Sequence, residues 1–173
     1  MKTLVVNLFG GPGVGKSTGA AYIFSKLKLL GINCEYVPEF TKECVWEGDQ
    51  FPLKHCQLKI IGEQSLRINR LLGKVDVIVT DSPLLLTVGY TDEKPYHDIC
   101  VYESKKQNSL NIVLNRVAKY NPVGRNESEK EAKEVDNKII KFLKDNEFKF
   151  TVVDGNEEGF KKVVDIIVEW FEN

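Results

Sequence analysis

The 173-residue sequence lacks several features that would place a protein in a broad functional class. It has no apolar run of about 18 residues or more, so no segment is predicted to cross a bilayer. It also has almost no net charge, because 24 basic side chains are matched by 25 acidic ones. This balance argues against a surface that attracts nucleic acid or anionic membrane as a whole. A local basic pocket remains compatible with it.

The sequence also lacks a cysteine motif and a cleavable leader. No two of the four cysteines have the C-x-x-C spacing, so we expect free thiols in a reducing, cytoplasmic compartment. The apolar start, residues 1–9, is followed by glycines rather than by a small-residue cleavage site. We therefore predict a strand there and not a signal peptide.

What the sequence does contain is an alternation of strand and helix patterns. Apolar runs predict strands over residues 2–9, 34–37, 75–80, 110–114 and 148–153. Helical periodicity and stop signals predict helices over residues 16–30, 53–72, 128–143 and 158–171, and a broken helix over 84–107. The alternation predicts one α/β domain over residues 1–173, with a parallel sheet covered on both faces.

The glycines are concentrated near the N-terminus, in "GGPGVGKST". This segment contains the Walker A pattern Gly10-x4-Gly15-Lys16-Ser17, between a predicted strand and a predicted helix. Glycines allow positive φ, so that successive N–H groups point at phosphate oxygens. The Lys16 ammonium reaches the β- and γ-phosphates, and the Ser17 hydroxyl binds Mg²⁺. The predicted contacts to ATP are Gly11, Gly13, Val14, Gly15, Lys16, Ser17 and Thr18.

Other signatures narrow the class of P-loop protein. The sequence has neither the N-K-x-D element of GTPases nor the L-S-G-G-Q signature of ABC-type ATPases. AAA-type motors are usually larger and carry a helical lid domain, for which 173 residues leave no room. The compact P-loop kinases of nucleosides, nucleotides and similar small molecules remain.

Four segments carry a more specific resemblance: "GGPGVGKST", "YVPEF", "VTDSP" and "NPVGRNESEKEA". In this order, over residues 1 to about 143, the chain resembles the kinase domain of NadR-like nicotinamide riboside kinases and phage-encoded P-loop nucleoside and nucleotide kinases. The resemblance implies three α/β/α layers with strand order 2-3-1-4-5. It also implies ATP and Mg²⁺ as cosubstrates, and a lid segment that carries arginines.

Two carboxylates follow predicted strands, and ligands gather at the carboxyl ends of parallel strands. Asp81 ends "VDVIVTD", a Walker B pattern, and would lie near Ser17 and hold Mg²⁺ if the third strand adjoins the first. It could instead cap the helix after Pro83. Glu39 lies where related deoxynucleoside kinases have a general base, and a carboxylate suits that task. A solvated loop glutamate, or exchanged roles for Glu39 and Asp81, are the alternatives.

A lid is predicted at about residues 116–127, after the fourth strand. Arg116 and Arg125 flank it and would neutralise charge on the transferring phosphoryl group, because the planar guanidinium binds phosphate oxygens bidentately. Both could instead be ordinary surface arginines. Gly155, after the fifth strand, is expected at the adenine by topology alone.

The sequence signals are weakest for the residues that would bind the phosphoryl acceptor. Phe40 could stack on an acceptor ring, Gln64 could read a base edge, and Arg67 could hold an acceptor phosphate. A solvated basic face over residues 54–74 and core aromatics are the simpler alternatives. We expect a nucleoside, nucleotide or nicotinamide-riboside-like acceptor. A kinase for nucleic acid (a 5′-hydroxyl or a hydroxymethylated base) and a nucleotide-dependent binding module or switch ATPase stay open.

Overall fold

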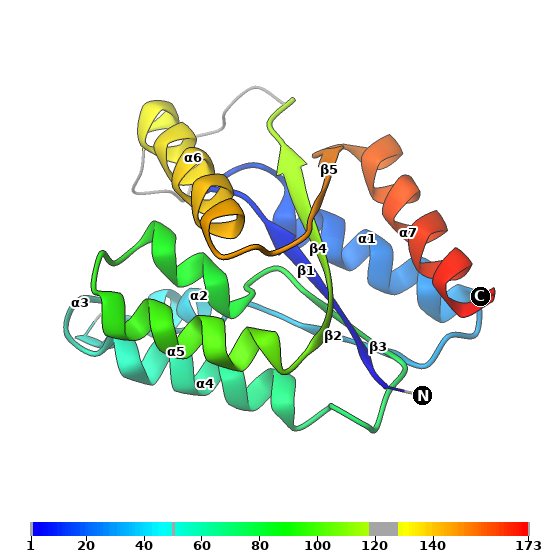
Figure 1. Ribbon diagram of the computed structural model, residues 1–173, viewed down its shortest axis with the longest axis horizontal. Coiled ribbons are helices and arrows are strands. Elements are labelled where there is room, and N and C mark those ends of the chain that lie inside the picture. Colours follow the sequence, from blue (N-terminus) through cyan, green and yellow to red (C-terminus); the bar gives the residue numbers. More distant parts are fainter. Residues whose placement is uncertain (1, 50, 118–127, 173) are drawn as a thin grey trace.

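A five-stranded parallel sheet forms the centre of the protein, shown as a computed structural model in Figure 1. The structure describes residues 2–49, 51–117 and 128–172. The strands are β1 (Leu4–Phe9), β2 (Cys34–Val37), β3 (Val77–Thr80), β4 (Asn108–Asn115) and β5 (Thr151–Asp154). Their order, β2-β3-β1-β4-β5, confirms the predicted fold class and strand order.

Helices cover both faces of the sheet, as Figure 1 shows. One face carries α1 (Lys16–Leu29) and α7 (Glu157–Glu172), and the other carries α4 (Gln57–Asn69), α5 (Lys94–Lys105) and α6 (Glu129–Asp145). The described residues also form three short helices: α2 (Phe40–Glu47), α3 (Phe51–His55) and the 3-10 helix η1 (Leu84–Gly89). Within the described part of the chain, no helix combines the length and apolar character that crossing a bilayer requires.

The central strand β1 explains why the sheet is covered on both sides. All six of its residues are buried, and side chains of a strand alternate between its faces. Leu4, Val6 and Leu8 pack in the core beneath α1 and α7, whereas Val5 and Phe9 pack in the cores beneath α4, α5 and α6. A nearly continuous apolar run is therefore required here, rather than an alternating one.

The structure corrects the prediction between β2 and β3. The helix predicted over residues 53–72 is two helices, α3 and α4, which are separated at Cys56, where the backbone is not helical (φ −144°, ψ 65°). No helix was predicted between residues 37 and 53, where the structure has α2 and the start of α3. Pro95 lies in the first turn of α5, where proline is tolerated, and so begins that helix.

The strand register brings three loops to one edge of the sheet. Asn7 of β1 lies level with Thr80 of β3, and Thr80 lies level with Val37 of β2. The segments that follow these strands are the glycine-rich loop, the turn at Glu39 and the turn at Asp81. Because parallel strands end together, these segments form one side of a shared site.

Candidate active site

The backbone of the glycine-rich loop is curled as the Walker A pattern predicts. Gly10, Gly13 and Gly15 have φ of 145°, 81° and 100°, in a region that L side chains rarely adopt. Gly15 is also the N-cap of α1, and no side chain caps that helix end. The loop and the first turn of α1 therefore keep backbone N–H groups available for an anion.

The Lys16 side chain lies across this loop. Its ammonium donates hydrogen bonds to the carbonyl oxygens of Gly10 (2.7 Å) and Gly11 (3.2 Å). Burial lowers the pKa of Lys16, while the carboxylates of Glu39, Asp81 and Asp136 act in the opposite direction. Three acids from separate elements thus lie close enough to interact with the P-loop lysine, among them both acids that the sequence analysis selected.

Asp81 lies at the end of β3 with a side chain that is almost fully buried, at 3% exposure. Its Oδ2 accepts a hydrogen bond from the Tyr36 hydroxyl at 2.9 Å, and the Ser17 side chain lies close enough to the same hydroxyl to lower its pKa. Burial and the adjacent Asp81 carboxylate raise the pKa of Tyr36, so this phenol stays protonated and donates. Tyr36 thus connects the two residues that were predicted to bind metal.

The donors at this point suit Mg²⁺. Asp81 Oδ1 is buried and has no hydrogen-bond partner among the described residues, and such an oxygen is costly unless a cation or a donor meets it. Mg²⁺ is usually held by one or two protein oxygens together with water and substrate phosphates. Among the described residues, no group of three or more His, Cys, Asp or Glu side chains is placed to hold a metal ion.

Glu39 is the N-cap residue of α2, in extended backbone directly after β2. It is half-buried and accepts a short hydrogen bond from the Thr41 hydroxyl. Its charge acts on Lys16 more strongly than that of Asp81 does. Glu39 therefore lies in the phosphate region while keeping one face accessible, a position that a proton acceptor for an incoming hydroxyl needs.

Gln64 of α4 supports the turn that carries Glu39. Its side-chain oxygen accepts from the Phe40 N–H at 3.0 Å, and its amide nitrogen donates to the Pro38 carbonyl at 3.4 Å. These contacts fix the backbone on both sides of Glu39. Since the side chain is only 4% exposed, its hydrogen-bonding capacity is used within the protein.

Arg67 and Phe40, the other predicted acceptor residues, lie together. The Arg67 guanidinium stands 4.9 Å from the centre of the Phe40 ring and pairs with both carboxylate oxygens of Glu43, one at 2.7 Å. This pairing lowers the pKa of Glu43 and raises that of Arg67. A pocket of about 300 Å³ adjoins the pair at the β2 edge of the sheet. Its lining includes Tyr36, Pro38, Glu43, Glu63, Arg67 and Arg70.

Arg116, predicted at the base of the lid, points at the P-loop. Its guanidinium donates to the Pro12 carbonyl oxygen (2.8 Å) and to Oδ2 of Asp136 (2.9 and 3.2 Å). A second pocket of about 300 Å³ lies beside this contact, and its lining includes Gly10, Asn115, Arg116 and Asp136, together with residues of β4, β5 and α6. Arg125 lies outside the described residues, as does most of the predicted lid.

The remaining predicted nucleotide contacts differ in their exposure. Thr18 is exposed in the first turn of α1, whereas Val14 is buried in the core beneath α7. Gly155 packs against the P-loop: a Cβ there would lie 2.2 Å from the Val14 carbonyl oxygen, and its N–H donates to the Asn115 carbonyl at 2.9 Å. The loop after β5 and the P-loop thus touch directly, through a position that only glycine fits.

Two residues of the site were missed by sequence reasoning: Tyr36 and Asp136. Tyr36 precedes "VPEF" on a strand whose residues alternate between faces, so its position near a strand end was the available signal. Asp136 offers no such signal, because it is one of several acids on a charged helix that follows the lid. Contacts that span 45 and 125 residues of sequence bring them to the site.

Comparisons with known proteins agree with this architecture. A family profile described as "AAA domain" matches residues 5–159, a range that contains all the site residues described above. The label AAA is also used for the motor ATPases that were set aside above because of their size. The profile itself matches the P-loop domain of this chain. No curated protein matches the chain.

A solved structure described as "Crystal structure of NadR protein in complex with NR" matches with a TM-score of 0.74 and 16% sequence identity. The match covers 96% of this chain and 51% of that one, so the chain spans about half the length of the matched structure. At this identity the likeness establishes the fold. It confirms the resemblance to NadR-like proteins that the four sequence segments indicate.

Proposed function

Because the chain belongs to the AAA-domain family whose profile covers residues 5–159, we propose that it transfers the γ-phosphoryl group of ATP to a hydroxyl of a small acceptor. The observation that carries this proposal is the convergence on Lys16 of two strand-end carboxylates, Glu39 and Asp81. One of them suits metal binding through a buried, unpartnered oxygen, and the other is half-buried and accessible. A protein that only binds nucleotide has no need of the second carboxylate.

Each residue has a task in the proposed reaction. Lys16 leaves the Gly10 and Gly11 carbonyls and binds the β- and γ-phosphates, while Ser17 and Asp81 hold Mg²⁺. Mg²⁺, when bound, neutralises the negative charge that develops on the phosphate oxygens. Glu39 accepts the proton of the acceptor hydroxyl as its oxygen bonds to the γ-phosphorus. The bond from that phosphorus to the β–γ bridging oxygen breaks, and ADP leaves with the electron pair.

For the acceptor we propose a nucleoside, a nucleotide or a nicotinamide-riboside-like molecule. The NadR protein was solved with NR, and its fold is shared over 96% of this chain. The pocket lined by Tyr36, Arg67 and Glu43 supplies an aromatic side chain and charged groups near the Glu39 turn. We place the activity in the cytoplasm, because the four cysteines are free thiols.

The test is a transfer assay with γ-labelled ATP and Mg²⁺ against a panel of nucleosides, nucleoside monophosphates and nicotinamide riboside. Labelled product with at least one acceptor, abolished by EDTA, supports the proposal. In E39Q, transfer should fall by about two orders of magnitude or more while ATP affinity is retained, since a general base contributes about 10²–10⁴-fold. Transfer to no member of the panel, with ATP binding intact, would refute the proposal.

Two other functions are outcomes of the same assay. The exposed basic side chains Lys59 and Arg70 on and after α4 favour a nucleic-acid acceptor, so a 5′-hydroxyl oligonucleotide and a hydroxymethylated one belong in the panel. Selective labelling of these, with binding that weakens steeply with salt, would indicate a nucleic-acid kinase. Slow ATP hydrolysis without any acceptor would indicate a switch ATPase.

A further inference from the structure

Asp136, on the helix that follows the predicted lid, joins the P-loop to Arg116. One carboxylate oxygen, Oδ1, accepts a short hydrogen bond from the Gly11 N–H. The other, Oδ2, accepts from Nε (3.2 Å) and Nη2 (2.9 Å) of Arg116. Arg116 in turn donates from Nη1 to the Pro12 carbonyl at 2.8 Å. This acid–base pair therefore holds two consecutive residues of the loop, one by its N–H and one by its carbonyl.

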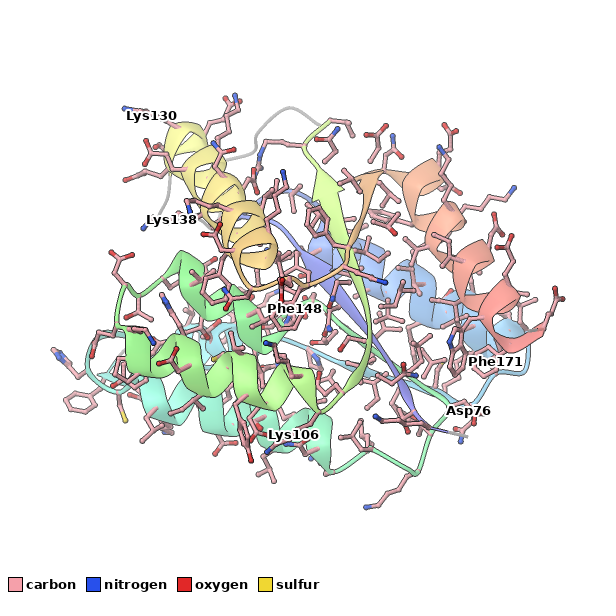
Figure 2. All side chains as sticks on the ribbon, in the orientation of Figure 1. Asp76, Lys106, Lys130, Lys138, Phe148 and Phe171 are labelled. Carbon is pink, nitrogen blue, oxygen red and sulfur yellow. The ribbon has the colours of Figure 1, made fainter. Side chains whose placement is uncertain are left out.

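The pair is shielded from water, unlike the ion pairs on the outer face of the same helix. The side chains of Arg116 and Asp136 are 10% and 19% exposed, whereas those of Lys130 and Glu134 are 88% and 60% exposed. Figure 2 shows Lys130 and Lys138 pointing outward from α6, away from the sheet. If one partner of a shielded ion pair is removed or moves away, the other charge stays shielded without a partner, which is costly. The Arg116 and Asp136 side chains therefore keep each other in this arrangement.

The backbone of α6 lies directly against the loop at Gly11. A Cβ at this position would come within 2.5 Å of the Ala132 carbonyl oxygen and 3.0 Å of Asp136 Oδ1. From the other side, Lys16 donates to the carbonyl oxygens of Gly10 and Gly11. Residues 10–12 are consequently held by α6, by Arg116 and by Lys16, and the contacts to α6 and Arg116 remain when Lys16 turns to the phosphates as proposed above. The residues that follow, which would meet phosphate, therefore start from an anchored segment.

We infer that Asp136 is a positioning residue for nucleotide binding and transfer. Through Gly11 it fixes the first limb of the P-loop, and through Arg116 it aims the arginine that stands at the start of the predicted lid. The loop-fixing part needs only nucleotide binding, and the Arg116 part rests on the proposed function.

Two substitutions at position 136 separate these contacts. D136N keeps an oxygen that can accept from the Gly11 N–H but removes the charge that Arg116 needs, and D136A removes both. The dissociation constant of a fluorescent ATP analogue with Mg²⁺ should rise about tenfold in D136A, as expected for loss of a charged hydrogen bond, and should stay closer to wild type in D136N. Turnover (kcat) should fall in both variants. A purely architectural role would not divide affinity from kcat in this way.

The matched control is E134Q, an exposed acid on the outer face of α6. It should leave affinity and kcat at wild-type values, and circular dichroism with thermal melts should show that every variant used is folded. Wild-type affinity in D136A, or an equal loss in D136A and E134Q, would overturn the inference. If D136A does not fold, the inference is tested with D136N, R116Q and the double variant that carries both substitutions. A loss of kcat in the double variant no larger than in either single variant supports the pair. Additive losses overturn it.

The role of Asp136 can be tested independently of the proposed function. If the wild-type protein transfers phosphate to no acceptor, the proposed function fails, and the affinity of D136A for the ATP analogue still tests Asp136. If transfer occurs and D136A binds and turns over like wild type, Asp136 fails and the proposed function stands.

Discussion

The two sides of the site are built in different ways. On the phosphate side, the loop geometry is set by glycines, and charged contacts from α1, β4 and α6 meet on residues 10–12. On the proposed acceptor side, polar groups of α2 and α4 bind one another, as in the Glu43–Arg67 pair. Two aromatic side chains there, Trp46 and Phe51, are 81% and 67% exposed.

The difference follows from what each side has to recognise. ATP presents the same phosphate oxygens in every reaction. A rigid array of backbone N–H groups can therefore bind them whatever the acceptor is. An acceptor is defined by its shape and its polar edges, which side chains on helices can be changed to match. If the proposed function holds, we therefore expect the determinants of substrate identity in the region of α2, α3 and α4, where the sequence carries the fewest motifs.

The largest expected effect is at Lys16. K16A removes the only loop side chain proposed to contact the β- and γ-phosphates, so transfer of label from ATP should fall below detection. The fold should persist, because the cores beneath α1 and α7 do not include this side chain. Circular dichroism and the labelled-ATP assay measure both quantities. Retained turnover would contradict the phosphate-loop assignment.

The next effect concerns the contact between α6 and the P-loop. In G11A the new methyl group meets the Ala132 backbone carbonyl at 2.5 Å, and backbone cannot move aside as a flexible side chain can. We expect a loss of about 1–3 kcal/mol in the free energy of unfolding, as for other overpacked sites, together with weaker binding of the ATP analogue. Urea unfolding and a fluorescence titration measure the two. Full stability in G11A would show that α6 does not constrain the loop.

A smaller effect is expected on the acceptor side, at Glu43. The pairing with Arg67 lowers the pKa of Glu43 in the folded state below its usual value of 4.5. The contribution of the pair is therefore complete above pH 4.5 and is lost as the pH falls through the folded-state value. Since Glu43 is partly exposed, E43Q should cost at most about 1 kcal/mol at neutral pH.

The pH dependence of this difference supplies the check. Urea unfolding of E43Q and wild type should give stabilities that converge as the pH is lowered below 4.5, where Glu43 becomes protonated. E47Q, at an exposed position near the end of α2, is the matched control and should follow wild type throughout. A difference between E43Q and wild type that grows on acidification would contradict the assigned sign.

The smallest expected effect is a gain in stability at Gly62, opposite to the loss expected in G11A. Gly62 lies exposed within α4, and a Cβ there would meet nothing within 4 Å. G62A should therefore stabilise the protein by about 0.5–1 kcal/mol, because alanine has less conformational entropy to lose in a helix than glycine. A rise in melting temperature with unchanged ATP affinity is expected. Lowered stability would mean that α4 requires glycine for a reason other than space.

The elements that the sequence predicted well are those with local signals. The helix predicted over residues 128–143 occurs as α6, and it begins with a capping box in which the Ser128 side chain accepts from the Glu131 N–H and the Glu131 carboxylate accepts from the Ser128 N–H. The β2 strand occurs over the predicted residues, Cys34–Val37. The region between β2 and β3 was predicted less well. Apolar periodicity there continues across Cys56, and no glycine or proline at that position marks the break between α3 and α4.

In the candidate site, too, the residues with local sequence signals were predicted better than those placed by long-range contacts. The P-loop and the two strand-end acids could be selected from sequence, because a phosphate cradle needs consecutive N–H groups and because parallel strands end at one edge. Whether Glu39 or Asp81 is the base stays a prediction. Gln64 and Arg67 were selected as acceptor contacts, and their contacts in the structure are to the Glu39 turn and to Glu43, which periodicity could not indicate.

The sequence by itself determined the glycine-rich loop, its lysine and serine, and an alternation of strands and helices that predicts a doubly covered parallel sheet. Each of these is encoded by neighbouring residues, through φ preference, capping or period. Only the tertiary structure decided that Tyr36 connects Ser17 to Asp81, and that Asp136 and Arg116 hold Gly11 and Pro12. Those contacts depend on strand register and on how closely α6 approaches the loop, and long-range packing sets both.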